Sequence, residues 1–595
     1  MYMEKNTFEF NPKIYAKEMT SILKEVKKEV RIKKSLFNNN DLQKILLQYP
    51  DKDKNLFRRS HLIAGYHYLI SKKLFKKSDE IIKVIRMKPI RTQSGVTPVT
   101  VLTKPFPCPG QCIFCPNDVR MPKSYLSDEP GAQRAAMNKF DPYLQVYNRL
   151  LAFKEIGHNV EKVELIVLGG TWSFYPEPYQ IWFIKRCFDA MNDFPSYDHR
   201  KEITTGNIYK NAKPKQMAQT YNNAIAKIAG GKFFSKNEHA TWEELERSHK
   251  KNETALCRNV GLVLETRPDY INEKEVIKLR RFGATKIQIG IQSCDDIILN
   301  KNKRGHTQKE TQNAINLLRL AGFKIHAHWM PNLYGASVAS DIKDYKKLWT
   351  PPYSPDELKI YPTSIIANTE LYTLYKDGRY KPYSYDDLLN LFLHILPMTP
   401  RYVRLTRIVR DIPSNDIVAG NKFTNFRQIG ENEVLNSGKK LQDIRSREVK
   451  QMNITLKNLL LEKIQYKTPV STEYFISYKT KMYPNNKKEG DKIVGFLRLS
   501  FPKKTESKNN FMPEIRNSAM IREVHVYGQV VGISQKQKGK AQHLGLGTKL
   551  IELAEKMVKK SGYKKLAVIS AIGTREYYRK RGFEKSGMYL SKNLL

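Results

Sequence analysis

The sequence has little cysteine and no long hydrophobic segment. Its 595 residues include only 6 cysteines, which show no even framework of the kind that disulfide-rich secreted domains carry. No apolar run reaches the length of a membrane-spanning helix, and Met1–Phe10 lacks the charged-then-apolar layout of a signal peptide. These absences exclude a disulfide-stapled scaffold and a membrane protein, and they favour a cytoplasmic protein in a reducing environment.

Acidic residues are scarce relative to basic ones. There are 59 Asp and Glu against 103 Lys and Arg, a formal net charge of +44. The excess partly reflects a composition rich in lysine and asparagine, but it favours a polyanionic partner, and nucleic acid is the first choice. Over residues 1–85, apolar residues recur at helical spacing with basic pairs between them. We therefore expect a basic helical region at 1–85.

Three of the cysteines are concentrated in one short loop. Cys108, Cys112 and Cys115 have C-x3-C-x2-C spacing, and Gly110 lets the loop turn tightly. Three thiolates can hold three irons of a 4Fe–4S cluster and leave the fourth iron without a protein ligand. Structural zinc normally takes a fourth Cys or His, which does not follow at a typical spacing, and a disulfide would leave one thiol over. The loop favours the cluster over these alternatives and over core cysteines.

From about residue 86, short β-branched runs alternate with helical stretches. Repeated strand–helix units imply a parallel sheet whose carboxyl strand ends meet at one edge, where catalytic groups sit. We expect an α/β domain at 86–400, a partial (β/α)6 barrel, with a polar helical insertion at 196–257 and a connector at 401–465. The expected strands are Thr97–Thr103, Val163–Leu168, Val260–Leu264, Lys286–Ile291, Lys324–Met330 and Leu358–Tyr361.

The ends of these strands carry residues suited to a cofactor. S-adenosylmethionine (SAM) suits a cluster with one open iron, because its amine and carboxylate can complete the iron and the cofactor supplies the difficult chemistry. Glycines after the second strand permit close backbone approach, and polar side chains at later strand ends can hydrogen-bond the ribose or carboxylate. The expected SAM contacts are Gly169, Gly170, Thr171, Glu265, Arg267, Gln292 and Lys359.

Residues 466–595 are expected to form a second α/β unit with a different glycine motif. Gln542, Gly545 and Gly547 form a Q-x-x-G-x-G pattern at a strand-to-helix turn. Small residues there let backbone N–H groups and the positive end of a helix hold a pyrophosphate. With the neighbouring strand and a downstream tyrosine pair, the pattern is typical of GNAT acetyltransferases, which bind acetyl-CoA.

Two side chains in this unit are candidates for chemistry. Tyr578 is a candidate to approach the thioester sulfur, and core packing is the alternative for one of Tyr577 and Tyr578. Glu523 is a candidate general base if its pKa is raised. The alternative for Glu523 is an ion pair with a lysine.

Together the motifs resemble the catalytic subunit of Elongator, a family that joins a radical SAM domain to an acetyltransferase domain. The resemblance runs from about Lys88 to the C-terminus. Its phrases include CPGQCIFCP, GLVLETRPDY, IQIGIQS, REVHVYG, QHLGLGT and GTREYYRKRGF. It implies a partial (β/α)6 radical SAM barrel followed by a GNAT-type mixed α/β domain, with a 4Fe–4S cluster, SAM and acetyl-CoA.

The resemblance also implies residue roles. It assigns Lys162 to acetyl-CoA, a role that the sequence pattern alone does not indicate. With the glycine motif, the expected acetyl-CoA contacts are Lys162, Glu523, Val524, His525, Val526, Gln542, Gly545, Leu546, Gly547, Thr548 and Tyr578, of which Lys162, Glu523 and Tyr578 are expected to be catalytic. The chain departs from the family at Asn117 and Asn332, and no cysteine lies near Arg445, which makes a connector zinc site doubtful.

The activity that the resemblance implies is modification of ring carbon five of the wobble uridine of tRNA. A deoxyadenosyl radical would take hydrogen from the acetyl methyl, the acetyl-derived radical would add to the uridine, and thioester hydrolysis would leave a carboxymethyl group. Residues 1–85 would bind tRNA, and other Elongator subunits or a second copy are possible partners. A protein lysine acetyltransferase with a structural cluster and a non-enzymatic tRNA-binding scaffold with degenerate sites are the alternatives.

Overall fold

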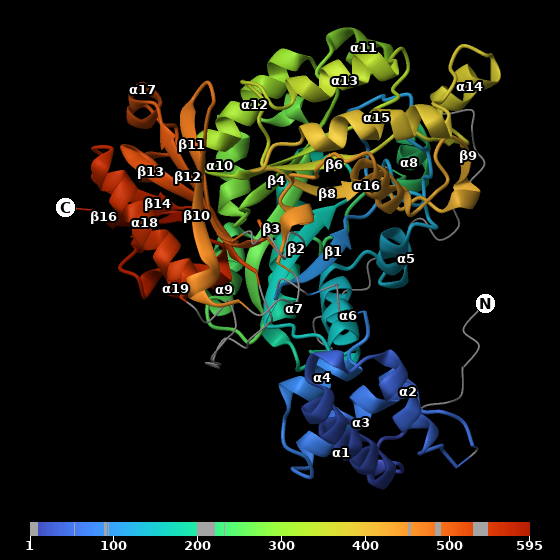
Figure 1. Ribbon diagram of the computed structural model, residues 1–595. Helices are drawn as coiled ribbons and strands as arrows, with labels where there is room; N and C mark the ends of the chain where they lie inside the picture. Colours follow the sequence, from blue (N-terminus) through green and yellow to red (C-terminus); the bar gives the residue numbers. More distant parts are fainter. Residues whose placement is uncertain are drawn as a thin grey trace.

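The computed structural model describes residues 10–52, 54–88, 92, 95–198, 221–230, 232–449, 454–481, 490–527 and 545–594. Three parts follow one another along the chain (Figure 1): a helical part, a parallel sheet with helices outside it, and a mixed sheet. Within the described residues, no helix combines the length and the apolar character needed to cross a membrane.

The N-terminal part folds around a core of its own. Its helices are α1 (Ala16–Lys33), α2 (Asn39–Leu47), α3 (Arg59–Ser71) and α4 (Asp79–Ile85). Met19, Ile22, Leu23 and Val26 recur at helical spacing on α1 and are fully buried. The side chain of Asn38 accepts backbone N–H groups of the first turn of α2, which begins that helix. The expected helical region is confirmed.

The central part is an all-parallel sheet in the order β1-β2-β3-β4-β5-β6-β8. The expected partial barrel is therefore confirmed, with one strand more than the six expected. The additional strand, β8, lies in the segment 401–465 that was expected to be a connector. The strands are β1 (Thr97–Leu102), β2 (Lys162–Leu168), β3 (Arg258–Thr266), β4 (Lys286–Gln292), β5 (Lys324–Trp329), β6 (Glu357–Ile360) and β8 (Arg404–Ile408).

Helices cover the outer face of this sheet (Figure 1). The helices of this part are α5 (Pro130–Met137), α6 (Pro142–Glu155), α7 (Glu177–Asp193), α8 (Tyr221–Ala229), α9 (Trp242–Asn252), α10 (Glu273–Arg281), α11 (Asp296–Lys301), α12 (Gln308–Leu320), α13 (Val338–Lys347), α14 (Glu370–Lys376), α15 (Tyr385–Met398) and α16 (Phe426–Asn436). Helices α8 and α9 belong to the expected insertion at 196–257. A small antiparallel pair, β7 (Ile365–Ile366) and β9 (Ile417–Ala419), lies apart from the main sheet.

The C-terminal part is a mixed sheet in the order β10-β11-β12-β13-β14-β16-β15. Only β13 and β14 pair in parallel, and the other neighbours are antiparallel. The strands are β10 (Leu459–Lys467), β11 (Ser471–Thr480), β12 (Ile493–Pro502), β13 (Ser518–Val526), β14 (Lys565–Val568), β15 (Glu584–Ser586) and β16 (Tyr589–Asn593). The helices are α17 (Lys504–Lys508), α18 (Leu546–Lys560) and α19 (Arg575–Arg579).

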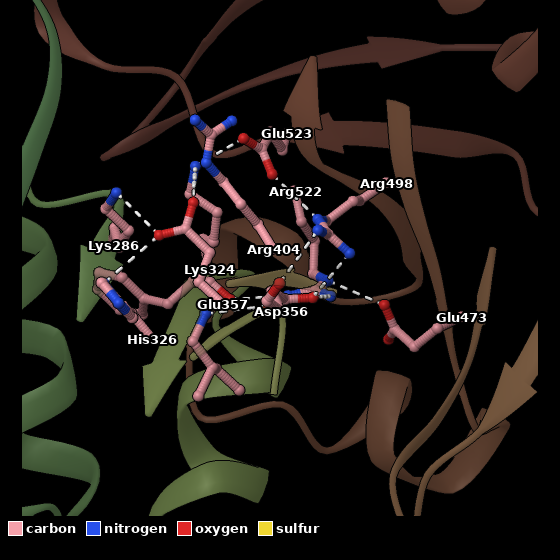
Figure 2. Close-up of polar contacts among 12 residues, drawn as sticks. Lys286, Lys324, His326, Asp356, Glu357, Arg404, Glu473, Arg498, Arg522 and Glu523 are labelled. Atoms are coloured by element: carbon pink, nitrogen blue, oxygen red, sulfur yellow. Dashed lines mark hydrogen bonds and ion pairs between the residues drawn. The ribbon is translucent and has the colours of Figure 1, made fainter. Parts of the chain in front are cut away.

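Buried charges join the two large sheets (Figure 2). Asp356, just before β6, accepts hydrogen bonds from Arg522 of β13 at 2.6 and 2.7 Å, and Arg498 of β12 lies 3.3 Å away. Arg522 also donates to Glu473 of β11 at 2.9 Å. Burial alone would raise the pKa of Asp356, but Arg522 and Arg498 hold that pKa well below its usual value. The sheets are thus fixed by side chains that stay charged.

Candidate functional site

A cavity of about 190 Å³ lies at the carboxyl ends of the strands of the central sheet. The loop between β1 and α5 supplies Cys108, Cys112 and Cys115 to its wall. Parallel strands place their carboxyl ends at one edge, so residues distant in sequence meet there. The site expected from the cysteine spacing and from the polar strand ends is therefore one cavity.

Two arginines flank the most buried of these cysteines. Arg304 donates to Cys112 Sγ over 3.4 Å, and Arg267 Nη1 lies 4.0 Å from the same sulfur. A hydrogen bond with Cys115, and then the charges of Arg304 and Arg267, hold the pKa of Cys112 well below its usual value, although burial opposes them. Cys115 Sγ lies 3.2 Å from the hydroxyl of Ser124. Cys112 is therefore favoured as a thiolate, the form that binds metal, whereas the hydrogen bond with Cys112 and burial raise the pKa of Cys115.

In the part of the chain that the structure describes, no group of three His, Cys, Asp or Glu side chains could hold one metal ion. In an iron–sulfur cluster each thiolate binds a different iron, so the three sulfurs do not have to converge on one ion.

Six of the seven residues expected to contact SAM line this cavity: Gly170, Thr171, Glu265, Arg267, Gln292 and Lys359. The seventh, Gly169, has a φ of 128°, and a Cβ there would stand 2.0 Å from the Thr103 hydroxyl oxygen. The glycine at 169 is thus required by its close approach to β1. The structure brings the expected set together.

Three polar atoms on the cavity wall have no hydrogen-bond partner among the described residues. They are Glu265 Oε2, Gln292 Oε1 and Arg304 Nε. An unpaired buried polar group costs about 1–3 kcal/mol, so such atoms in a cavity indicate a ligand that pairs with them. Burial raises the pKa of Glu265, although Lys359 and other nearby cations oppose it. The wall fits a ligand that carries donors and acceptors, as SAM does.

Two functional residues were missed by the sequence reasoning. Arg304 also donates to the carbonyl of Gly290 at 2.7 Å; it lies in a stretch that resembles the family, but nothing in its pattern indicated contact with a cysteine. Arg410 lines the cavity and pairs with Glu129 at 2.7 Å. Arg410 follows β8, a strand that was not expected, so no predicted strand end indicated this residue.

A second cavity of about 530 Å³ lies between the two large sheets. Residues of both sheets line it, and it shares Leu168, Lys359 and Arg407 with the first cavity. The two cavities therefore adjoin at these three residues. Of the residues expected to contact acetyl-CoA, four line the second cavity: Glu523, Val524, His525 and Tyr578.

The wall of the second cavity is charged where the interior of a parallel barrel is normally apolar. Lys286 of β4 pairs with Glu164 at 2.8 Å and with Glu357 at 3.1 Å. Lys324 of β5 pairs with Glu357 at 3.3 Å and with Glu523 of β13 at 2.5 Å, as Figure 2 shows. Burial opposes the charge on Lys286, but Glu164 and Glu357 raise its pKa. A chain of alternating charges thus runs from the barrel to the second sheet.

Glu523 is held in ion pairs rather than poised as a base. Its other oxygen accepts from Arg498 Nε at 2.9 Å. Burial would raise the pKa of Glu523, but Lys324 and Arg498 lower it, and a general base for neutral pH requires the opposite direction. The neighbouring His525 is half-buried on the wall of the cavity. Loss of hydration lowers its pKa to about 4, and its Nε2 has no partner among the described residues.

The start of α18 has the geometry expected of the glycine motif. Gly545 precedes the helix with a φ of 68°, a left-handed conformation that favours glycine. A Cβ on Gly547 would lie 2.5 Å from the Tyr577 hydroxyl oxygen. Arg581 donates to Thr548 Oγ1 at 2.8 Å, and its guanidinium lies 3.5 Å from the centre of the Tyr577 ring. Arg581 is a further basic residue beside this helix start, and the sequence reasoning had not singled it out.

For the other residues expected to contact acetyl-CoA, the structure gives less direct support. Tyr578 is buried, and burial raises the pKa of its hydroxyl. Leu546 is buried in α18. Lys162 begins β2 and lines neither of the two cavities; burial lowers its pKa. Val526 ends β13, and Gln542 lies outside the described residues.

Two family profiles match the chain. The profile of the Radical SAM superfamily matches residues 107–338, and the profile of the Radical_SAM C-terminal domain matches residues 355–435. The first match contains the cysteine loop and the strands from β2 to β5. The second contains β6, β8 and β9.

Curated proteins and a solved structure resemble most of the chain. A tRNA uridine(34) acetyltransferase of Methanocaldococcus jannaschii is 37% identical over 530 residues, covering 86% of this chain and 87% of that protein. Elongator complex protein 3 of Homo sapiens is 33% identical and covers 86% of each. The structure of archaeal Methanocaldococcus infernus Elp3 with an N-terminus deletion (1–46) has a TM-score of 0.65 and 32% identity, covering 84% of this chain and all of that chain.

Proposed function

Because the chain belongs to the family of the tRNA uridine(34) acetyltransferases and Elongator complex protein 3, we propose that it modifies carbon five of the wobble uridine of tRNA, with acetyl-CoA and SAM as co-substrates. The observation that carries the proposal is the junction of the two cavities at Leu168, Lys359 and Arg407. The three cysteines line one cavity, and four of the residues expected to contact acetyl-CoA line the other. Radical chemistry and an acyl donor are thereby brought together in one chain.

On the first cavity, we assign the cluster to Cys108, Cys112 and Cys115. When bound, the cluster and SAM supply one-electron radical chemistry. Glu265 and Gln292 have unpaired acceptor atoms that suit the ribose and the methionyl amine. Arg267 and Arg304 carry positive charge beside Cys112 and favour its thiolate form.

We assign acetyl-CoA to the end of β13, on the second cavity, and to the start of α18. Backbone N–H groups at a helix start attract phosphate, and Arg581 adds a positive charge beside them. We propose Tyr578 as a catalytic residue, Lys162 as an acetyl-CoA contact that the family resemblance implies, and Glu523 as a positioning residue. The ion pairs of Glu523 support a role in fixing the site. Tyr578 packs in the core of this part, and its place on the wall of the second cavity supports contact with the acyl end.

The proposed polynucleotide substrate is supported by charge. The chain carries a formal net charge of +44, and residues 1–100 contain 22 Lys and Arg against 10 Asp and Glu. Basic side chains that neutralise phosphates supply much of the affinity of nucleic-acid complexes. We propose that the helices α1 to α4 contribute to tRNA binding in the cytoplasm, with other Elongator subunits or a second copy as further partners.

Anaerobic reconstitution tests the proposal. The protein is loaded with iron and sulfide and incubated with tRNA, acetyl-CoA, SAM and reductant, and the wobble uridine is analysed by mass spectrometry. A carboxymethyl-type adduct that disappears in Cys112→Ala is the expected result. Cleavage of SAM without any modified uridine would contradict the proposal, and acetylation of a lysine peptide that persists in Cys112→Ala would favour a protein acetyltransferase.

A further inference from the structure

The insertion between β2 and β3 covers the cysteine loop. Helix α8 buries Tyr221, Ala224 and Ile225 against Val119, which lies just after Cys115 in the chain. The described residues after α8 continue this cover, because the ring of Phe234 lies 5.1 Å from that of Phe106. The insertion therefore contacts the chain both before and after the cysteines.

One side chain of α8 holds the backbone of the first cysteine at two points. The amide N–H of Cys108 donates to Asn222 Oδ1 at 2.9 Å, and Asn222 Nδ2 donates to the carbonyl of Cys108 at 2.8 Å. A paired donor and acceptor on one residue restrains both its φ and its ψ. Asn222 therefore restrains the backbone from which the Cys108 side chain projects, although 114 residues separate the two in the chain. The sulfur itself lies 4.0 Å from Thr171 Oγ1.

Two further contacts fix the segments on either side. The hydroxyl of Tyr221 donates to the carbonyl of Met121 at 2.7 Å, and the ammonium group of Lys123 lies 4.8 Å from the centre of the Tyr221 ring. On the other side, Lys104 forms a buried ion pair with Glu238 of the insertion. Truncating one partner of such a buried pair leaves an uncompensated charge, so these contacts resist movement of the insertion.

We propose that this segment, the described residues 221–230 and 232–238, is a clamp that pre-organises the cysteine loop, and that Asn222 is the positioning residue for Cys108. The inference rests on the cluster of the proposed function, since it assigns the clamp to that group. Cys112 and Cys115 are held by other contacts, with Arg304 and Ser124. Loss of the Asn222 side chain alone is therefore expected to affect one ligand of the three.

The test compares Asn222→Ala with the wild type in protein freed of metal. Each cysteine is alkylated with iodoacetamide, and its rate is followed by peptide mass spectrometry. The net contribution of one hydrogen bond corresponds to about a fivefold change in the equilibrium between the closed and the open cysteine loop. The loss of two such bonds therefore predicts at least fivefold faster alkylation of Cys108. Cys112 and Cys115 are expected to change by less than about twofold, and equal rates for Cys108 in the variant and the wild type would overturn the proposal.

Controls come from the same chain. Lys227→Ala removes an exposed side chain of α8 and is expected to leave the rate of Cys108 unchanged. Cys187, Cys257 and Cys294 are buried elsewhere and should stay unreactive. If these three cysteines react in Asn222→Ala, that variant has lost its fold. The test then uses Asn222→Asp, which keeps the acceptor oxygen but not the donor, and compares its rate of Cys108 alkylation with that of the wild type.

A second readout uses the reconstituted protein. The rate at which a chelator bleaches the visible absorbance of the cluster is expected to rise at least fivefold in Asn222→Ala and less in Asn222→Asp. The electron paramagnetic resonance signal of the reduced cluster should also change in Asn222→Ala and not in Lys227→Ala. A wild type that binds no cluster would refute the proposed function, but the alkylation of metal-free protein would still decide the clamp.

Discussion

The buried carboxylate that joins the two large sheets gives a sharp test of how the two cavities are held together. Asp356→Asn keeps the size of the side chain, and its amide oxygen can still accept the Ile325 N–H that Asp356 Oδ2 now accepts at 2.9 Å. The change removes the negative charge between Arg522 and Arg498, which are both buried. Removing one partner of a buried ion pair typically costs about 3–5 kcal/mol. We expect a loss of that size in the free energy of unfolding at neutral pH.

The pH dependence of this loss of stability is a second test of the role of the Asp356 charge. Because the folded pKa of Asp356 is lowered from 3.8, its stabilisation is complete above that value and is lost as the pH falls through the lower folded pKa. The difference between variant and wild type should therefore be constant near neutral pH and shrink in acid.

Denaturant unfolding followed by circular dichroism measures this difference, and Asp377→Asn is the matched control. Asp377 pairs with Arg379 at 2.7 Å, but their side chains are 45% and 59% exposed, so its loss should cost no more than about 0.5 kcal/mol. If both variants lose the same free energy of unfolding at neutral pH, the charge of Asp356 does not hold the two sheets together.

Three further predictions follow from the charges. Glu523→Gln should leave the shape of the pH profile of acetyl-CoA hydrolysis unchanged, because Lys324 and Arg498 already hold the carboxylate charged; loss of a limb of that profile, measured by initial rates, would identify Glu523 as the base. Burial raises the pKa of Asp341 from 3.8 to about 7, so the free energy of unfolding should fall as the pH rises between these two values. In Asp341→Asn, the denaturant midpoint should depend less on pH across the same range. The logarithm of the tRNA association constant, measured by filter binding, should fall linearly with the logarithm of salt concentration, and a flat response would contradict a basic RNA-binding surface.

The strands and their polar ends were predictable because they depend on local pattern. The second strand was expected at Val163–Leu168 and is found at Lys162–Leu168, and Gln292 was identified because a polar residue followed a buried run. β8 was missed because Arg404–Ile408 reads Arg-Leu-Thr-Arg-Ile, and this short basic stretch without strict alternation fits an exposed connector equally well. Its burial depends on pairing with β6, which the local sequence does not encode.

The contacts that define the site could not be predicted in the same way. Arg304 and Cys112 are 192 residues apart, and Asn222 reaches Cys108 from an insertion whose polar composition indicated only a surface excursion. Both contacts follow from how loops at one edge of the sheet fold over each other. Spacing in the sequence indicates which groups are capable of chemistry, whereas their partners depend on the tertiary arrangement.

The charged wall of the second cavity has a physical consequence for the proposed reaction. Apolar side chains pack to high density and close the interior of a small barrel, whereas ion-paired side chains such as Lys286, Lys324 and Glu357 are held at defined positions by their partners. Burying such pairs gives little net stability, so their presence is not explained by folding alone. They leave a cavity of about 530 Å³ that adjoins the cysteine cavity at Lys359. In the proposed function, an acyl group bound near Glu523 approaches the first cavity through this polar interior.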